Sequence, residues 1–267
     1  MSLQSIDISF RYGPRFGIDG INVGAGRGEW LGIIGANGSG KTTLLRLLCG
    51  LLAPSSGRVV LDDEPLERYS ANRRARHLAY VPQHYQPTFE FTVEQAVLHG
   101  RMPYSGTYGG FESDADVVAA EEAIAVMDIH SLRHEPVTRL SGGELQRVMI
   151  ARSIAQSDHN ILLDEPTSHL DIAHQQTVLD SIRARSRDRG TTVIATMHDL
   201  NLAAIYCDRL AAMVNGRLVA LGTPAEVLTE SLLAEVFGVR LDVEPNIYGD
   251  APAVRYRYAR QEVNNAA

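Results

Sequence analysis

The chain has 267 residues, 45% of them hydrophobic and 21% charged, which is the composition of a folded globular protein and excludes a disordered one. Its formal net charge of −7 argues against a broad nucleic-acid surface, because phosphate backbones are held mainly by clustered Lys and Arg. The two dense basic runs, 73–77 and 183–189, are interpreted as solvated helix faces. The sequence shows no apolar run of about 18–20 residues and no charged-then-apolar leader, so we expect a cytoplasmic protein that reaches a membrane only through a partner.

The first third of the chain alternates strand patterns with one helix. Residues 3–10 alternate apolar and polar side chains, and the apolar run 30–34 predicts a buried strand that leads into a glycine-rich loop. Apolar residues at helical spacing then predict a helix over 41–52. Further strands are expected at 58–61, after a Pro-Ser-Ser-Gly turn, and at 78–81. The order is therefore strand, strand, glycine loop, helix, strand, strand.

The pattern changes in the middle of the chain. Helical periodicity is found at 93–99, 115–127 and 143–154, and the segments between these stretches are rich in Gly, Ser and Tyr. No strand pattern interrupts them. We therefore predict an all-helical insert over 86–156.

Strand patterns return after this insert. Short apolar runs at 161–163 and 191–197 predict buried strands of a parallel sheet, and a helix is expected at 200–206. The Asn-Gly pair at 215–216 predicts a hairpin, because this dipeptide favours a tight two-residue turn. The final stretch, 241–267, predicts a short strand and a frayed tail.

A glycine-rich loop joins the strand at 30–34 to the helix at 41–52. Its sequence fits the pattern G-x-x-x-x-G-K-[ST] at every fixed position, in the strand-to-helix context that the pattern requires. Glycines let successive main-chain N–H groups point at a phosphate, and the helix adds its positive N-terminal end. The residues predicted to bind nucleotide phosphates here are Gly35, Asn37, Gly38, Ser39, Gly40, Lys41, Thr42 and Thr43.

Specific roles follow for several of these groups. Lys41 should reach the β- and γ-phosphates of ATP, the Thr42 hydroxyl should bind Mg²⁺, and Thr43 should border the α-phosphate. After the strand pattern at 161–163 come two carboxylates, Asp164 for the Mg²⁺ shell and Glu165 as candidate general base for a water aligned on the γ-phosphorus. These features fit kinases, GTPases and motor ATPases equally well.

A later segment chooses among these classes. Residues 140–147 read Leu-Ser-Gly-Gly-Glu-Leu-Gln-Arg, and here the sequence resembles the ATP-binding subunits of ABC transporters, whose signature begins with the same four letters. The resemblance extends from Phe10 to about Val239. A serine and two glycines at a helix start offer a hydroxyl, bare N–H groups and the helix N-terminus to an anion. The resemblance implies a head-to-tail dimer in which one subunit completes the ATP site of the other through Ser141, Gly142, Gly143 and Glu144.

Glu144 stands where the family more often has Gln, a variant associated with importer subunits. The resemblance also assigns roles to residues outside these motifs. Tyr12 matches the ring that stacks on adenine, and Gln83 matches the glutamine that touches Mg²⁺ and the attacking water. Asp171 matches the acid of a loop that communicates across the dimer, and the preceding His169 receives no role. His198, at the end of a predicted strand, matches the switch histidine that contacts the γ-phosphate.

The fold implied by the resemblance is α/β: a P-loop NTPase (RecA-like) core with an N-terminal antiparallel β subdomain and an inserted α-helical subdomain. In this division one ABC ATPase domain spans the chain. Residues 1–85 and 157–240 form the nucleotide-binding core with its β subdomain, 86–156 form the helical subdomain, and 241–267 form a C-terminal extension.

The resemblance further implies partners and a location. Two membrane permease subunits are expected to place cytoplasmic helices beside Gln83 and the helical insert, with an extracytoplasmic substrate-binding protein involved indirectly and no nucleic acid. The chain would then lie at the cytoplasmic face of the cell membrane. The segments Phe-Thr-Val at 91–93 and Gly-Arg-Met-Pro at 100–103 are similar to importers of iron chelates, haem and vitamin B12. We therefore predict the ATPase subunit of a metal-chelate importer, carrying an iron-siderophore, haem or cobalamin.

Three alternatives stay open. An exporter ATPase subunit would keep the ATP motifs but lose the context at 91–93 and 100–101. A non-transport ABC ATPase acting on DNA or ribosomes would show a long coiled-coil insertion or two fused ATPase units. A regulator that binds nucleotide without hydrolysis would have lost Lys41, Glu165 or His198, and all three are present.

Overall fold

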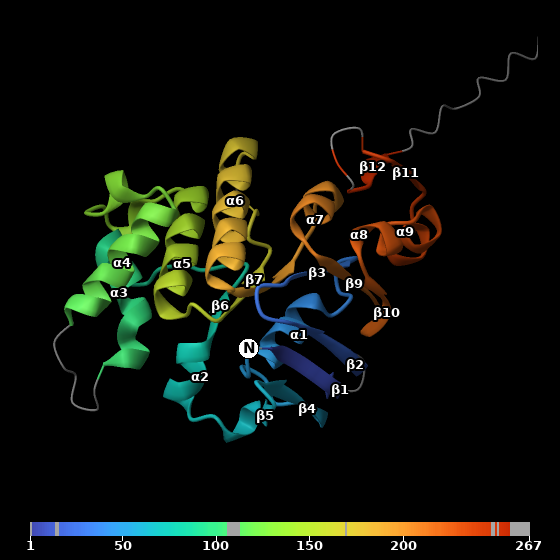
Figure 1. Ribbon diagram of the computed structural model, residues 1–267, viewed down its shortest axis with the longest axis horizontal. Helices are drawn as coiled ribbons and strands as arrows, with labels where there is room; N and C mark the ends of the chain where they lie inside the picture. Colours follow the sequence, from blue (N-terminus) through green and yellow to red (C-terminus); the bar gives the residue numbers. More distant parts are fainter. Residues whose placement is uncertain are drawn as a thin grey trace, which may run out of the picture.

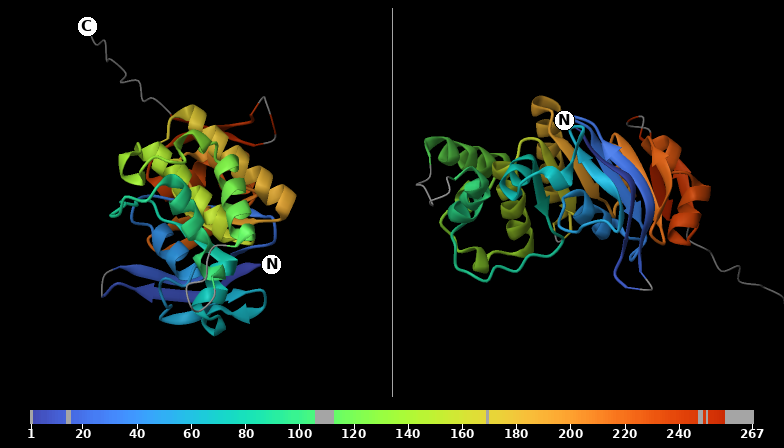
Figure 2. Two further views of the ribbon diagram at one scale, coloured as in Figure 1. Left: turned by 90° about the vertical axis from the view of Figure 1, so that its left-hand side faces the viewer. Right: turned by 90° about the horizontal axis from the view of Figure 1, so that it is seen from below.

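In the described residues, a six-stranded sheet, a four-stranded sheet, a small two-stranded sheet and a group of helices make up the fold of the computed structural model (Figures 1 and 2). The structure describes residues 2–13, 16–105, 113–168, 170–246, 249 and 251–256. The elements in chain order are β1 Leu3–Arg11, β2 Gly17–Ala25, β3 Trp30–Gly35, α1 Lys41–Leu48, β4 Ser56–Leu61, β5 Glu64–Pro65, η1 Leu66–Arg68, α2 Ala71–His77, β6 Leu78–Val81, α3 Val93–Leu98, η2 His99–Tyr104, α4 Asp114–Val126, η3 His130–Leu132, η4 Val137–Arg139, α5 Gly142–Gln156, β7 Asn160–Asp164, α6 Ile172–Arg189, β8 Thr192–Thr196, α7 Leu200–Tyr206, β9 Arg209–Val214, β10 Arg217–Gly222, α8 Pro224–Val227, α9 Glu230–Phe237, β11 Leu241–Glu244 and β12 Ala253–Tyr256.

The larger sheet has six strands in the order β10-β9-β3-β8-β7-β6. All neighbours from β9 to β6 run parallel, and β10 joins the edge as the antiparallel arm of the predicted hairpin. Every residue of β3, β7 and β8 is buried, as expected for parallel strands that are covered on both faces. Because parallel strands end at one edge, β6, β7 and β8 deliver the residues that follow them to the same side of the sheet.

The smaller sheet is antiparallel, in the order β2-β1-β4-β5. Helix α1 contacts strands of both sheets, and its leucines share one apolar cluster with residues of β1, β2 and β3. The sequence analysis did not identify β2, whose glycines weaken a strand pattern. Two of them are required by a close approach to β1: a Cβ at Gly17 would lie 2.1 Å from the Phe10 carbonyl oxygen, and one at Gly24 would lie 2.6 Å from the Cβ of Gln4.

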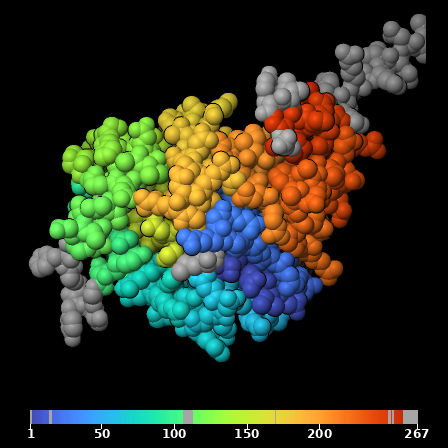
Figure 3. All heavy atoms as spheres, viewed as in Figure 1, coloured from blue at the N-terminus to red at the C-terminus, as the bar shows by residue number. Residues whose placement is uncertain are grey.

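The segment between β6 and β7 is helical and lies at one end of the molecule, whereas the C-terminal elements lie at the other (Figure 3). Helices α3 and α4 begin with capping boxes at Thr92 and Ser113. Buried apolar residues of α3, α4 and α5 belong to the same cluster as residues of β7 and β8, so these helices pack on the sheet. The division of the chain at 85/86 and 156/157 stays a prediction.

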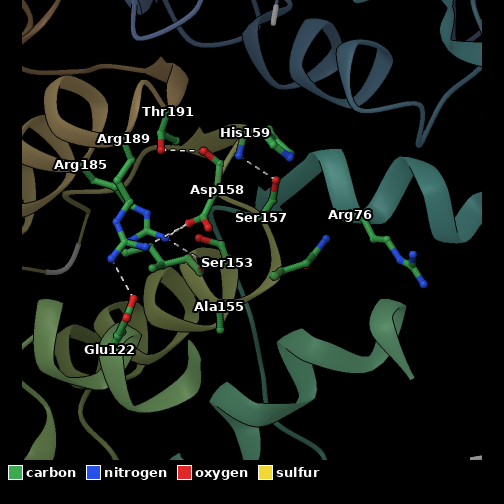
Figure 4. A network of polar contacts seen from close by, with 12 residues as sticks. Arg76, Glu122, Ser153, Ala155, Ser157, Asp158, His159, Arg185, Arg189 and Thr191 are labelled. Atoms are coloured by element: carbon green, nitrogen blue, oxygen red, sulfur yellow. Dashed lines mark hydrogen bonds and ion pairs between the residues drawn. The ribbon is translucent and has the colours of Figure 1, made fainter. Parts of the chain in front are cut away.

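Ion pairs also join these helices to the rest of the chain (Figure 4). Arg189 of α6 donates to Glu122 of α4 over 2.8 Å, and Arg185, one turn earlier, donates to Asp158 in the turn before β7. The basic run 183–189 was interpreted as a solvated helix face, and this interpretation is wrong for Arg185. That side chain is buried, and its burial lowers the pKa of the guanidinium against the opposing charge of Asp158.

Other elements differ from the predictions for identifiable reasons. Helix α1 ends at Leu48 and not at residue 52, because Gly50 adopts φ of +71°, the left-handed conformation that closes helices. Helix α6 was predicted only in its last part, where the basic run 183–189 was interpreted as a helix face, because the rest of its segment is polar and its buried apolar residues are few. These residues are Val178, Leu179 and Ile182. The C-terminal stretch holds a second strand, β12, which pairs with β11, and the tail at 257–267 lies outside the described residues.

A helix that crosses a membrane needs about 20 mostly apolar residues. In the described part of the chain, none is both long enough and apolar enough to cross a membrane.

Candidate active site

The loop between β3 and α1 forms a cradle that only glycine permits at its critical turn. Gly40 has φ of +104°, and a Cβ there would lie 2.7 Å from the Cγ2 atom of Ile18. Gly40 is also the N-cap of α1, and no side chain caps this helix start. The N–H groups of its first turn are therefore directed at the loop, in the arrangement that binds phosphate.

Two side chains inside the loop fit an incoming anion. The buried Lys41 ammonium donates to the carbonyl oxygens of Gly35, over 2.8 Å, and Ala36, over 3.1 Å. Burial lowers the pKa of Lys41, whereas the charges of Glu165 and Asp164 act in the opposite direction. The buried Oγ of Ser39 has no hydrogen-bond partner among the described residues. A phosphate oxygen would satisfy both groups.

Asp164 is the buried centre of a second set of polar contacts. Its Oδ1 accepts from the hydroxyls of Thr42, at 3.2 Å, and Thr196, at 2.9 Å, and its Oδ2 accepts from the Tyr80 hydroxyl at 3.3 Å. Burial and the Asp164 charge raise the pKa of Tyr80, so this phenol stays a donor. Sequence reasoning found Thr42 and Asp164 but missed Tyr80 and Thr196. The available signal was a polar residue at or near the end of a buried strand.

The Thr42–Asp164 pair fits a magnesium ion by its chemistry. A hydroxyl and a carboxylate are oxygen ligands, which Mg²⁺ prefers, and it usually keeps water and substrate phosphates as its other ligands. Within the described ranges, no three His, Cys, Asp or Glu side chains are grouped so that they could hold a metal ion alone. A metal held by Thr42 and Asp164 would complete its shell with water and substrate phosphates, as Mg²⁺ usually does.

Glu165 is held by residues that follow three neighbouring parallel strands. Gln83 follows β6, Glu165 follows β7 and His198 follows β8. One carboxylate oxygen of Glu165 accepts a short hydrogen bond from the Gln83 amide, and the other lies 2.5 Å from Nε2 of His198. The main chain of Glu165 has φ of +55° and donates to the Thr196 hydroxyl over 2.8 Å. A non-glycine residue in this conformation costs about 1–3 kcal/mol and is concentrated at functional sites.

Tyr12, the aromatic residue predicted to stack on adenine, lies on the surface near the loop between β1 and β2. Tyr12 stacks on Phe16 with ring centroids 6.1 Å apart, and Phe10 meets it edge-on at 4.7 Å. Both Tyr12 and Phe16 are exposed. Sequence reasoning missed Phe16, although an aromatic four residues after Tyr12 in a turn was the available signal.

The Leu-Ser-Gly-Gly segment begins a helix as predicted. Ser141 is the N-cap of α5, and Glu144 completes a capping box. The Glu144 carboxylate accepts from the Ser141 N–H at 2.8 Å and from its hydroxyl at 2.7 Å. In the described part of the chain, the recorded hydrogen bonds of Ser141 run only to Glu144 and Leu145, so the structure does not join this segment to the phosphate loop.

Asp171 lies in the loop between β7 and α6. Its carboxylate caps α6 by accepting from the His174 N–H at 2.9 Å, and it also contacts the ring Nδ1 of His174. Ser168 ties the same loop to the active site, because its hydroxyl donates to the main-chain oxygen of Glu165 over 2.8 Å. His169 lies outside the described residues.

Comparison with known proteins decides among the nucleotide-binding families. The model of the ABC transporter family matches residues 18–168. The chain belongs to the ABC transporter family. As an ABC ATPase it binds ATP and hydrolyses it, and its α/β architecture with an antiparallel subdomain is the predicted P-loop fold.

Relatives of this ABC ATPase include named import proteins. It is 44% identical over 247 residues to the hemin import ATP-binding protein HmuV of Pseudomonas aeruginosa, covering 91% of this chain and 94% of that protein. It is 38% identical over 226 residues to the cobalamin import ATP-binding protein BtuD of Halobacterium salinarum, covering 85% of this chain and 56% of that protein. Among solved structures, an inward-facing ABC transporter of the metal-chelate type aligns with a TM-score of 0.81 at 28% identity, over 95% of this chain and 96% of that one.

Proposed function

We propose that this ABC ATPase is the energy-supplying subunit of an importer for a metal chelate such as haem, cobalamin or an iron-siderophore. The observation that carries its catalytic part is the meeting of Gln83, Glu165 and His198 beside the phosphate loop. The import direction is supported by the names of the hemin and cobalamin relatives. Because cargo is bound by other subunits, haem is one member of a class of chelates that these residues allow.

The proposed hydrolysis begins with ATP in the cradle, where Lys41 and the first turn of α1 hold its phosphates. Mg²⁺ bound by Thr42 and Asp164 would neutralise phosphate charge. A water oxygen then forms a bond to the γ-phosphorus while the bond from that phosphorus to the bridging oxygen of ADP breaks. Glu165 accepts the proton of the water as general base.

Each carboxylate oxygen of Glu165 already has a side-chain partner, so an attacking water must compete for its lone pairs. In the described structure Gln83 occupies one oxygen and His198 the other. We propose that the γ-phosphate draws His198 away and so frees one carboxylate oxygen for water. Gln83 then remains to orient the water and to report the state of the site to the helices that follow it.

The proposed dimer is head-to-tail. Ser141 and Gly142 are exposed at the start of α5, although their helix N-terminus is suited to an anion. Ile172, the first residue of α6 after the Asp171 cap, is 86% exposed, which is unusual for a large apolar side chain. A second subunit that covers this surface would bring its phosphate loop to Ser141 and bury Ile172.

A separate surface is proposed to bind the two permease subunits. After Gln83 the chain exposes several large apolar side chains, of which Phe89 is the most open at 68%. The rings of Phe89 and Phe91 lie together, with centroids 5.9 Å apart, and exposed apolar side chains that gather in this way mark interaction surfaces. The permease helices would bind there, at the cytoplasmic face of the membrane, and a substrate-binding protein would act on the outer side. The members of this surface are Tyr85, Phe89, Phe91 and Met102.

The Gly-Arg-Met-Pro segment has a structural explanation in addition to its family resemblance. A Cβ at Gly100 would lie 2.4 Å from the carbonyl oxygen of Arg152 in α5, so this position requires glycine. Arg101 donates to Asp116 over 2.9 Å and to the Ala155 oxygen over 2.7 Å. These contacts fix the helices beside the proposed permease surface. The importer branch is supported over an exporter or a non-transport ATPase by the names of the hemin and cobalamin import relatives, whereas these contacts select neither a direction nor a cargo.

The test is reconstitution of the chain with its permease partner in vesicles, followed by ATPase measurements with binding proteins loaded with haem, cobalamin or an iron-siderophore. We expect one loaded binding protein to stimulate ATP turnover. We also expect its chelate to accumulate on the side of the membrane where the ATPase subunit lies. The matched control is the same binding protein without cargo. Stimulation by an unrelated cargo, or movement only in the opposite direction, would contradict the proposal.

A further inference from the structure

The C-terminal hairpin is attached to the helix that begins beside the active site. Strands β11 and β12 pair antiparallel, with Val243 opposite Val254, and β12 contacts α7 (Figure 1). The carboxamide of Asn201 in α7 makes both contacts to the main chain of Val254. Its Oδ1 accepts from the Val254 N–H at 2.8 Å, and its Nδ2 donates to the Val254 carbonyl oxygen at 3.1 Å. The side chain thus binds the outer edge of β12 as a neighbouring strand would.

The two hydrogen bonds between Asn201 and Val254, called the Asn201 clamp, lie close in sequence to His198. Asp199 follows His198 and is the N-cap of α7, accepting from the N–H groups of Asn201, at 2.8 Å, and Leu202, at 3.0 Å. The first turn of α7 is therefore fixed from two sides, by the Asp199 cap and by the bond from Asn201 to β12. A displacement of this turn would move the His198 main chain directly.

Packing alone does not hold the His198 side chain. It is 48% exposed, and an open pocket of about 480 Å³ separates this region from the hairpin. His198 and Asp199 line one part of the pocket, and Val254 and Tyr256 line another. Beside this pocket, the two hydrogen bonds of Asn201 join the C-terminal hairpin to α7. A pair of neutral hydrogen bonds is small in energy but fixes direction.

We propose that Asn201 is a positioning residue, whose clamp on the C-terminal hairpin holds the first turn of α7 so that His198 stays beside Glu165, within reach of the γ-phosphate that it binds. The inference rests on the proposed role of His198 in ATP hydrolysis. It gives the segment after α9 a function in the reaction, although none of its described residues reaches the phosphate loop by a recorded hydrogen bond. The Asn201 carboxamide is suited to this task because it supplies a donor and an acceptor on one rigid plane.

The test compares Asn201→Ala with Ile205→Ala, a control on the same helix at a side chain that is 56% exposed. For Asn201→Ala we expect kcat for ATP to fall about three- to tenfold, as for the loss of one or two neutral hydrogen bonds, with KM changed less than about twofold. The imidazole signals of ¹³C-histidine-labelled protein, with His198 assigned by its loss in His198→Gln, should show a moved or broadened His198 signal. The control should leave kcat and this signal unchanged.

Two further variants keep the test decisive. Val254→Pro removes the N–H that Asn201 accepts and should reproduce the Asn201→Ala effects from the hairpin side. Asn201→Asp keeps an acceptor for that N–H and should restore part of the turnover. If the variants melt earlier but keep kcat and the His198 signal, the hairpin only stabilises the fold and the inference is wrong. If His198→Gln keeps full turnover, the proposed role of His198 fails instead, and the histidine signal alone then decides whether the clamp positions it.

Discussion

Glu165 and His198 are joined by a contact of 2.5 Å between Oε1 of the carboxylate and Nε2 of the imidazole. The carboxylate is only 12% exposed, whereas the imidazole is 48% exposed, so the histidine is the partner that is free to move. The contact occupies one oxygen of the proposed base. Under the proposed mechanism, binding of a γ-phosphate to His198 would release this oxygen and so make hydrolysis depend on bound ATP.

Replacement of Glu165 by Gln tests the base directly. The amide has the same shape but cannot accept a proton from water, so steady ATP turnover should fall at least about a hundredfold, as for loss of a general base. ATP binding should persist, because Lys41 and the α1 N-terminus are untouched, and a dimer should accumulate with ATP. Nucleotide titration, turnover and size-exclusion chromatography measure these outcomes. Glu67→Gln, at an exposed acid of another element, is the control, and undiminished turnover in Glu165→Gln would refute the assignment.

Mixing two inactive variants tests the head-to-tail dimer. Ser141→Arg blocks the signature and Lys41→Ala removes the phosphate ligand, so each protein alone should be nearly inactive. In a random mixture about half of the dimers hold both chains, and each mixed dimer has one intact site, so about a quarter of the activity should return. The measurement is ATPase activity of the mixture, with mixed dimers verified by two affinity tags. Verified mixed dimers without recovered activity would contradict the shared site.

The sequence was sufficient to single out the residues that meet at Glu165 in the candidate site, because each one follows a strand with a strong apolar pattern. Gln83, Glu165 and His198 were each predicted from a motif, and the parallel register of β6, β7 and β8 explains why they meet. Tyr80 and Thr196 were missed because their role is to hold Asp164, and such a contact depends on neighbouring strands that are distant in sequence.

The fold was predictable where burial is continuous and less so where packing overrides local pattern. Strand β2 was missed because it contains Gly17 and Gly24, which have low strand propensity. Glycine is required at both positions because the backbone of β1 lies too close for a Cβ. The basic run 183–189 of helix α6 was interpreted as a solvated face, whereas Arg185 is buried and donates to Asp158, a contact distant in sequence. The second strand of the C-terminal hairpin, β12, pairs with β11 and is hydrogen-bonded to Asn201, and no local pattern signals this second contact.

The charge of Glu144 predicts a pH-dependent helix start. Its pKa is lowered, first by the hydrogen bond from the Ser141 hydroxyl and then by the Ser141 N–H. A carboxyl whose folded pKa lies below its unfolded value adds stability that is fully present above the unfolded value and is lost as pH falls through the folded one. Glu144→Ala should therefore lower the melting temperature at pH 7, by an amount that corresponds to about 0.5–2 kcal/mol for a lost cap, and the difference from the unmodified chain should shrink below about pH 4.

Glu144→Gln separates the charge from the hydrogen bonds. Glutamine still accepts from the Ser141 N–H, so this variant should retain most of the stability at pH 7 but lose the acid dependence. Thermal unfolding at several pH values measures both effects. A difference between Glu144→Ala and the unmodified chain that is constant from pH 7 to pH 3 would show that the ionised carboxylate contributes nothing to the helix start.

Asp158 offers a prediction about how the helices between β6 and β7 are held to the core. Arg185 is buried and donates to Asp158, so Asp158→Asn leaves a buried cation with a weaker partner. Removal of one member of a fully buried pair costs about 3–5 kcal/mol, and because the Asp158 side chain is 55% exposed we expect a smaller loss of about 1–3 kcal/mol. Arg189, which also pairs with Glu122, limits the loss further by its separate contact to α4.

Urea unfolding of Asp158→Asn, compared with that of Asp188→Asn, measures this loss. Asp188 is an exposed acid on α6, the helix that carries Arg185. The two changes remove the same charge from the chain, so a net-charge effect alone would lower stability equally in both. A larger loss in Asp158→Asn that persists in high salt would assign it to the buried partner, because exposed ion pairs are screened and buried ones are not. Equal losses would mean that Arg185 finds enough solvent or main-chain oxygen without Asp158, and that this ion pair contributes nothing measurable to stability.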